Sequence, residues 1–280
     1  MTSDTKALNV PPDTVKSCCA TLYESDLAKL LLGDSFHPGG LALTERLGQL
    51  LKLTAESRVL DVASGKGTSA MFLAERFGCE VIGIDYGKQN VDEANREAAA
   101  KRLGGRVRFE RADAELVPVL DTSFDAVICE CAFCTFPNKS IAAGEFARVL
   151  RLGGQVGLSD LTRGPVLPKE LDSLLAWVAC VADAQPIDSY AAYLRAAGLV
   201  VQCVEPHDEA LTELVGQVRT KLLGAEIMVG LKKLDLPGVD FGAAKRLVKD
   251  VVAAIEQRQL GYGIITAAKP QHSSLLMGAR

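Results

Sequence analysis

The sequence lacks the features of a chain that binds nucleic acid or spans a membrane. Its 31 basic and 35 acidic residues give a formal net charge of −4, and lysine and arginine are scattered without a basic run. A phosphate backbone selects clustered positive charge, so no nucleic-acid partner is expected. The longest apolar window, near residues 171–182, is shorter than the ~20 residues that a spanning helix needs. No membrane partner is expected either.

Two further absences bear on where the protein works. Residues 1–16 contain no apolar stretch, so neither a secretory signal nor a transit helix is expected, and the predicted location is the cytoplasm. Eight cysteines in 280 residues are too few for a disulfide scaffold, and a reducing cytoplasm keeps cysteines as thiols. The eight expected thiols are Cys18, Cys19, Cys79, Cys129, Cys131, Cys134, Cys180 and Cys203.

Apolar strands and amphipathic helices alternate through the middle of the chain. Strands are predicted at residues 58–62, 80–84, 107–110, 124–129 and 155–159, and helices between them at 68–77, 89–103 and 140–150. Strands joined by helical crossovers form a parallel sheet with both faces covered. The pattern therefore predicts an α/β fold with a doubly wound, mostly parallel sheet.

Helical segments flank this core on both sides. Residues 22–53 are predicted to form two helices joined by a turn. Later helices are predicted at residues 169–182, 189–197, 211–222 and 247–255, with strands at 200–204 and 260–268. The predicted division is an N-terminal helical segment that acts as a lid with substrate contacts (1–53), an α/β core (54–204), a helical insertion with a closing strand (205–270) and a tail (271–280).

A glycine turn follows the first core strand. Asp61 lies at the end of that strand, and a turn at residues 65–67 leads into the next helix. Glycines let a ligand approach the backbone, and the start of a helix offers unpaired N–H groups. Residues 65–70 also fit the pattern G-x-G-x-x-A, with Asp85 about 20 residues further on, as in a dinucleotide site.

The acids around this turn favour a ligand that carries an amine. In a dinucleotide fingerprint the first glycine directly follows the strand, whereas here Asp61 and three more residues come before it. An acid at that place suits a positively charged amine. A second acid, Asp113, follows the third strand, where it is placed to receive an adenine amino group, while Asp85 is placed to accept from ribose hydroxyls.

Residues 40–160 resemble the class I S-adenosylmethionine-dependent methyltransferases, which carry such elements in this order at their strand ends. The resemblance implies a Rossmann-like fold and S-adenosylmethionine as the cofactor. It implies that Asp61 and the glycine turn lie near the methionine moiety, Asp85 at the ribose, and Asp113 with Ala114 at the adenine. The expected cofactor-binding residues are Asp61, Gly65, Gly67, Asp85, Tyr86, Asp113, Ala114 and Glu130.

Three cysteines gather where the fourth core strand ends, at the rim where doubly wound folds bind ligands. They are Cys129, Cys131 and Cys134. Cysteine is also a small buried hydrophobe, and that interpretation is preferred for Cys79 and Cys203. Cys131 is instead interpreted as a ligand for the substrate.

The segment around Cys131 is similar to the arsenite methyltransferases. That family has a cysteine two residues past the strand, in a loop that ends Pro-Asp-Lys, and here Cys131 precedes Pro137-Asn138-Lys139 at the same spacing. It has another cysteine in a helix after the fifth strand, shortly after a tryptophan, and Trp177 and Cys180 match this arrangement. It also uses a cysteine in its N-terminal region. The resemblance implies three cysteines that hold As(III): Cys131, Cys180, and either Cys19 or Cys18.

The predicted reaction is S-adenosylmethionine-dependent methylation of arsenite. Thiolates bind soft As(III), whose lone pair attacks the sulfonium methyl without a general base. A thiol reductant such as glutathione or thioredoxin is an additional partner of such a reaction. Three alternatives stay open: methylation of oxygen, nitrogen or sulfur in a small organic molecule with Glu130 or His37 as base, a metalloid or redox sensor that binds the cofactor without turnover, and a nicotinamide-dependent oxidoreductase.

Overall fold

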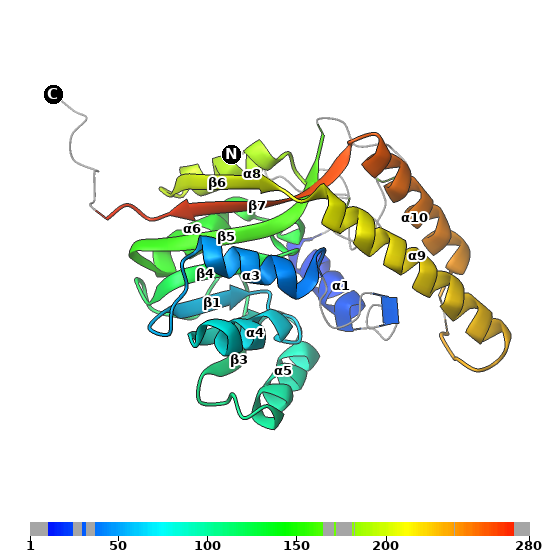
Figure 1. Ribbon diagram of the computed structural model, residues 1–280, viewed down its shortest axis with the longest axis horizontal. Coiled ribbons are helices and arrows are strands. Elements are labelled where there is room, and N and C mark those ends of the chain that lie inside the picture. Colours follow the sequence, from blue (N-terminus) through cyan, green and yellow to red (C-terminus); the bar gives the residue numbers. More distant parts are fainter. Residues whose placement is uncertain are drawn as a thin grey trace.

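The computed structural model describes residues 11–24, 30–31, 37–164, 171, 181, 183–237 and 239–271. Within these ranges seven strands form one sheet (Figure 1), in the order β3 (Val107–Arg111), β2 (Glu80–Asp85), β1 (Arg58–Val62), β4 (Phe124–Glu130), β5 (Leu150–Arg163), β7 (Leu260–Ala268) and β6 (Val200–Pro206). Strands β1 to β5 pair in parallel, and β7 runs antiparallel to both neighbours. The predicted doubly wound, mostly parallel α/β sheet is confirmed.

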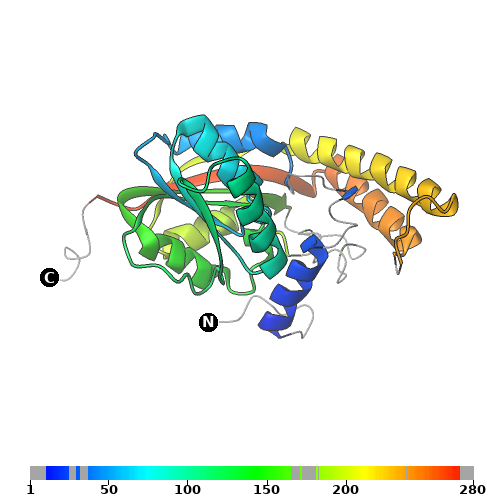
Figure 2. The same ribbon diagram turned by 90° about the horizontal axis from the view of Figure 1, so that it is seen from below.

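Helices cover both faces of this sheet. One face carries α3 (Gly40–Leu50), α4 (Thr68–Phe77) and α5 (Lys88–Ala100), and the other carries α6 (Lys139–Val149) and α8 (Ile187–Ala196) (Figure 2). Because the central strands are buried on both faces, they are largely apolar: Val59, Leu60 and Val62 of β1 are fully buried. The core therefore lies in two layers, one on each side of the sheet.

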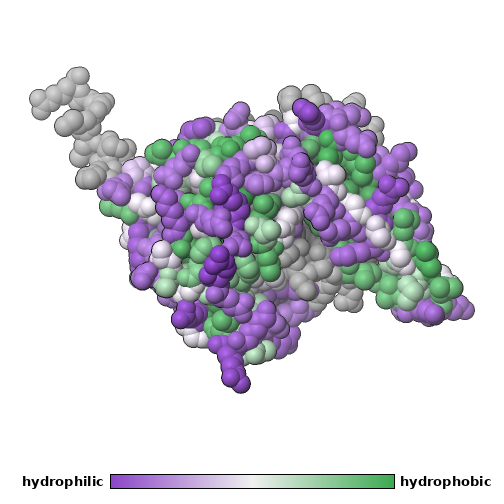
Figure 3. Space-filling model, in the orientation of Figure 1, coloured by the Kyte–Doolittle hydropathy of each residue, from purple (hydrophilic) through white to green (hydrophobic). Residues whose placement is uncertain are grey.

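The remaining elements lie beyond the carboxyl ends of the parallel strands. They are α1 (Pro12–Glu24), the short 3-10 helix η1 (Phe133–Thr135), and a hairpin of α9 (Asp208–Gly230) and α10 (Phe241–Glu256) that projects from the body (Figure 1). The hairpin stands in the sequence between β6 and β7. Apolar side chains gather towards its free end (Figure 3), where Leu223, Ile227, Met228 and Leu231 are exposed.

Local patterns located most elements well, and the differences have local causes. The strand at 58–62 and the helix at 68–77 were predicted with the bounds that β1 and α4 have. β5 begins at Leu150 rather than residue 155, because its first residue already pairs with Phe124 across an irregular register. The helix α1 was not predicted, and the N-terminal helices were expected to begin only at residue 22.

Two predictions concern residues outside the described ranges. Of the helix expected at 169–182, only residues 171 and 181 are described, and Cys180 also lies outside the described ranges. Among the helices that the structure describes, none combines the length and the apolar character that crossing a bilayer requires.

Candidate active site

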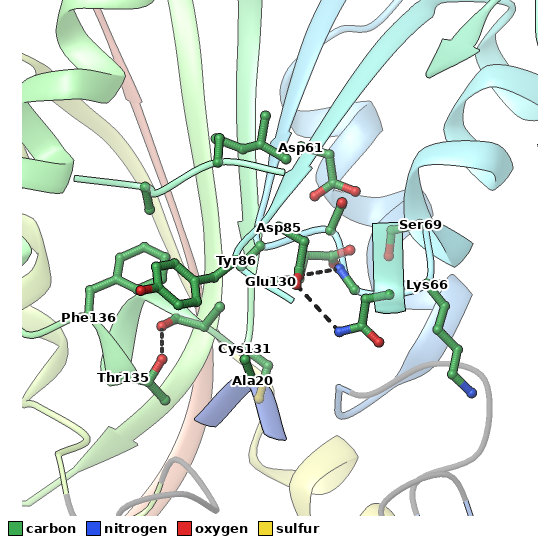
Figure 4. A pocket seen from close by; sticks show the side chains of 18 of the residues that line it. Ala20, Asp61, Lys66, Ser69, Asp85, Tyr86, Glu130, Cys131, Thr135 and Phe136 are labelled. Atoms are coloured by element: carbon green, nitrogen blue, oxygen red, sulfur yellow. Dashed lines mark hydrogen bonds between the residues drawn. The ribbon is translucent and has the colours of Figure 1, made fainter. Parts of the chain in front are cut away.

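A pocket opens at the carboxyl ends of β1, β2 and β4, where the strand order reverses between β1 and β4 (Figure 4). Ligands bind at this place in doubly wound sheets, because the loops of neighbouring strands leave in opposite directions and open a crevice. In Figure 4, Asp61, Ser69 and Lys66 lie on one side of the pocket, and Phe136 and Thr135 lie on the other. Seven of the eight predicted cofactor residues line it: Asp61, Gly65, Asp85, Tyr86, Asp113, Ala114 and Glu130.

Asp61 at the end of β1 is buried at 3% exposure, and its Oδ2 has no hydrogen-bond partner among the described residues. Burial raises the pKa of Asp61 well above its usual range, and the nearby charges of Glu130 and Asp85 raise it further. A buried carboxyl that lacks a partner is costly unless a ligand supplies one. This side of the pocket is therefore suited to a positively charged group.

Hydrogen bonds to Asp85 and close packing against Phe109 fix the conformation of the glycine turn. The N–H of Gly65 donates to Asp85 Oδ2 at 2.8 Å, and Asp85 Oδ1 accepts from the N–H of Gly87 at 2.8 Å. Gly67, with φ of 75°, directly precedes α4, and a Cβ placed on it would stand 2.2 Å from the ring of Phe109. Gly67 is absent from the part of the pocket wall that the described residues form, so it shapes the turn and does not touch the ligand space.

The far end of the pocket is closed by α1. Lys16 Nζ donates to Asp113 Oδ2 at 2.7 Å and to Glu115 Oε2 at 2.8 Å. Burial alone would lower the pKa of Lys16, but these two carboxylates outweigh it and raise the pKa. Glu115 also accepts from the backbone and side-chain nitrogens of Asn138, so three segments meet at one carboxylate. α1 is thereby fixed over the loop that follows β3.

A cluster of polar side chains lies beside Asp61. His37 is buried at 6% exposure, and its Nε2 is 3.6 Å from Glu130 Oε2 and 3.4 Å from Ser69 Oγ. Its Nδ1 is 3.2 Å from the carbonyl oxygen of Pro38. Thr44 Oγ1 donates to Glu130 Oε2 at 3.0 Å. His37 and Glu130 come from segments 93 positions apart and meet on the pocket wall.

The cysteines are distributed unevenly around the pocket. Cys131 lines it, with φ of 52°, directly after β4. Cys129 and Cys134 are fully buried, and burial raises the pKa of Cys129 well above its usual range. Cys79 is also fully buried, in agreement with a packing role. All the described cysteines are thiols: Cys18, Cys79, Cys129, Cys131, Cys134 and Cys203.

The structure does not bring Cys18 to the pocket. Lys16 and Ala20 of α1 line the pocket. Cys18 is about 200° around the helix from Lys16, which places it on the opposite face. The side chain of Cys19 and the whole of Cys180 lie outside the described residues. Within the described ranges, no group of three His, Cys, Asp or Glu side chains is arranged to hold a metal ion.

The chain is similar to known methyltransferases along most of its length. Residues 59–154 match the family of the methyltransferase domain. The 27-O-demethylrifamycin SV methyltransferase of Amycolatopsis mediterranei is 30% identical over 262 residues, which cover 88% of this chain and 94% of that protein. The arsenite methyltransferase of Halobacterium salinarum is 34% identical over 163 residues, which cover 56% of this chain and 40% of that protein.

A solved structure shares the fold. Phosphoethanolamine N-methyltransferase 2 of Haemonchus contortus, in complex with S-adenosyl-L-methionine, matches with a TM-score of 0.76 at 18% identity over 92% of this chain and 60% of that chain. The fold and the site together define a class I methyltransferase. The chain belongs to the S-adenosylmethionine-dependent methyltransferases, and S-adenosylmethionine is its cofactor.

The residues of the pocket fit this cofactor. Its amino and sulfonium groups are cationic, and the carboxyls of Asp61 and Glu130 line one side of the pocket. The open glycine turn at the start of α4 leaves room for close approach to the backbone. Motif reasoning found these positions but missed Lys16, because no local pattern marks a residue that reaches the pocket from another segment.

Replacing Lys16 by methionine is expected to speed release of the product S-adenosylhomocysteine about tenfold, because the partly buried ion pairs that close α1 over the pocket are lost. Stopped-flow release measures this directly. Sodium chloride should accelerate release from the wild type and leave the variant unaffected. Lys88→Met, which breaks an exposed pair with Asp92 outside the pocket, is the matched control. Release at the wild-type rate would show that α1 does not close the site.

Proposed function

We propose that this methyltransferase acts on a hydroxyl oxygen of a small organic molecule, with His37 as the general base. The pair of His37 and Glu130 on the pocket wall carries the proposal. The relative named for a 27-O-demethyl substrate supports it, because that similarity extends over nearly the whole of both chains. The arsenite methyltransferase covers only 56% of this chain.

The geometry of His37 suits removal of a proton. In the tautomer that carries its hydrogen on Nδ1, His37 donates to the carbonyl oxygen of Pro38, and the lone pair on Nε2 is left to take a proton. Nε2 faces Glu130 Oε2, whose negative charge stabilises the imidazolium once a proton has been taken. Thr44 holds the other side of the same carboxylate oxygen. The cofactor supplies an activated methyl group on its sulfonium.

A panel of acceptors with labelled S-adenosylmethionine tests the proposal. Hydroxylated organic compounds should be methylated, and His37→Gln should lower the rate by roughly 10² or more, the usual contribution of a general base. His207→Gln is the matched control, because that histidine contacts Glu205 away from the pocket. Cys131→Ser should retain activity. Full activity in His37→Gln would refute the assigned base.

Arsenite is the second candidate, and Cys131 on the pocket wall is the observation that favours it. It needs further thiolates, for which Cys180 and Cys19 are the candidates, and a thiol reductant such as glutathione. On this alternative As(III) is methylated in the same panel, Cys131→Ser and Cys180→Ser abolish turnover, and His37→Gln retains it. Tight cofactor binding without methyl transfer to any acceptor would instead favour a metalloid or redox sensor that binds the cofactor without turnover.

A further inference from the structure

A chain of hydrogen bonds runs from the pocket across neighbouring strands of the sheet, from β4 through β5 to β7. Tyr262 of β7 is buried at 1% exposure, and its hydroxyl donates to Ser159 Oγ of β5 at 3.1 Å. Ser159 Oγ donates in turn to Glu130 Oε1 at 3.3 Å. Tyr262 and Ser159 lie behind the pocket wall, whereas Glu130 is part of it. Side chains from three strands are thus joined in one line that ends at the cofactor site.

The direction of each hydrogen bond in this chain is fixed by the chemistry of its members. Burial raises the pKa of Tyr262 well above its usual range, and the charges of Cys131, Glu130 and Asp160 raise it further, so the phenol keeps its proton. Ser159 has a single hydroxyl proton. Because Tyr262 donates to the serine oxygen, that proton is left for Glu130. Tyr262 therefore orients a group that it touches only through Ser159.

The backbone of Tyr262 is held where β6 ends. Its N–H donates to Asp208 Oδ1 at 3.0 Å, and its carbonyl oxygen accepts from the N–H of His207 at 2.7 Å. Asp208 is the first residue of α9, so its carboxylate continues the ladder of β7 past the last residue of β6. On the other side Tyr262 pairs with Leu161 of β5. The backbone that carries the phenol is therefore held on one side by residues 207 and 208 and on the other by β5.

Glu130 needs such support because a second acid lies beside it. Asp61 and Glu130 both line the pocket, and the charge of Glu130 contributes, after burial, to the raised pKa of Asp61. When the cationic cofactor favours ionisation of Asp61, repulsion between the two carboxylates favours rotation of Glu130 away from Asp61. Ser159 holds Oε1 and Thr44 holds Oε2, one donor on each oxygen. With both donors in place the carboxylate stays at the pocket.

We propose that Tyr262 is a positioning residue that acts through Ser159 to hold the Glu130 carboxylate at the cofactor's cationic end. This inference concerns cofactor affinity and is independent of which acceptor is methylated. It assigns a role to the strand that closes the sheet, since β7 then contributes to the site without reaching it.

Calorimetric titration with S-adenosylmethionine tests the inference in variants of the full chain. Tyr262→Phe should weaken binding about fivefold, as expected for one neutral hydrogen bond, and Ser159→Ala roughly tenfold or more, since its bond is to a charged group. The double variant should bind no more weakly than Ser159→Ala alone, because Tyr262 acts only through that serine. In a Glu130→Gln background, both single changes should leave affinity unchanged.

Tyr190→Phe is the matched control for loss of a buried phenol. Tyr190 is equally buried, but its hydroxyl donates to the carbonyl oxygen of Leu161, away from Glu130. It should lower thermal stability without changing cofactor affinity. Equal effects of Tyr262→Phe and Tyr190→Phe on affinity, additive losses in the double variant, or persistence of the losses in the Glu130→Gln background would each overturn the inference.

Discussion

Asp61→Asn is expected to weaken S-adenosylmethionine binding about a hundredfold without weakening the fold, since a hydrogen bond to a charged group contributes about 1.5–3 kcal/mol. Asp61 Oδ2 is buried and lacks a partner among the described residues, so we expect it to bind a cationic group of the ligand. Asparagine keeps the shape of the side chain and removes the charge. Calorimetry measures the affinity, and chemical denaturation measures the stability of the ligand-free protein.

The raised pKa of Asp61 gives this prediction a pH dependence. The folded, ligand-free protein holds a proton on this carboxyl that the unfolded chain has already released, so stability falls as pH rises from the unfolded pKa towards the folded one. The asparagine variant should lose this part of the pH dependence. Binding of the cationic cofactor favours the ionised carboxyl, so it should release a proton and tighten as pH rises. Wild-type affinity in Asp61→Asn would contradict the assignment.

Gly67→Ala is expected to destabilise the fold by roughly 2–6 kcal/mol, because positive-φ strain and overpacking each cost about 1–3 kcal/mol. The φ of 75° disfavours any Cβ, and the added carbon would stand 2.2 Å from the ring of Phe109. The ring has no room to retreat, because a Cβ on Gly83 would meet the same ring at 2.3 Å. Phe109 therefore occupies the space that both glycines leave.

Two control variants separate the causes of this loss. Gly198 has φ of 86° with no described atom within 4 Å of its added Cβ, so Gly198→Ala reports the backbone strain alone. Gly104 has neither a positive φ nor a described neighbour within 4 Å, so Gly104→Ala should be nearly neutral. Urea denaturation of the three variants gives the comparison. A Gly67→Ala loss no larger than that of Gly198→Ala would mean that Phe109 does not restrict the turn.

Short-range pattern was sufficient for the features that lie within one segment. Asp61 and the glycine turn were predicted because a strand, an acid and a helix start follow one another directly, and β1 and α4 have the predicted bounds. Cys131 was placed at the rim because it directly follows β4. Each of these positions depends on neighbours only a few residues away.

Features that depend on tertiary packing could not be predicted from the sequence. Lys16 gave no signal, because its partners Asp113 and Glu115 are about a hundred positions away. Cys18 was a candidate ligand only while the phase of α1 was unknown, since rotation of that helix decides which residues face the pocket. The contact of Tyr262 with Ser159 spans 103 positions and depends on β7 lying next to β5. Periodicity cannot supply these pairings.

β7 follows β5 and β6 in the sequence, yet it lies between these two strands in the sheet. While α9 and α10 are being synthesised, β5 has one edge without its final partner and β6 has no partner at all. The place between β5 and β6 stays unfilled until Leu260–Ala268 has been synthesised. This order favours slow, late completion of the sheet. Exposed strand edges of this kind are natural binding sites for chaperones and for aggregation. The support of Glu130 by Tyr262 then begins only once β7 has been synthesised, so a growing chain cannot hold its cofactor at full affinity before that point.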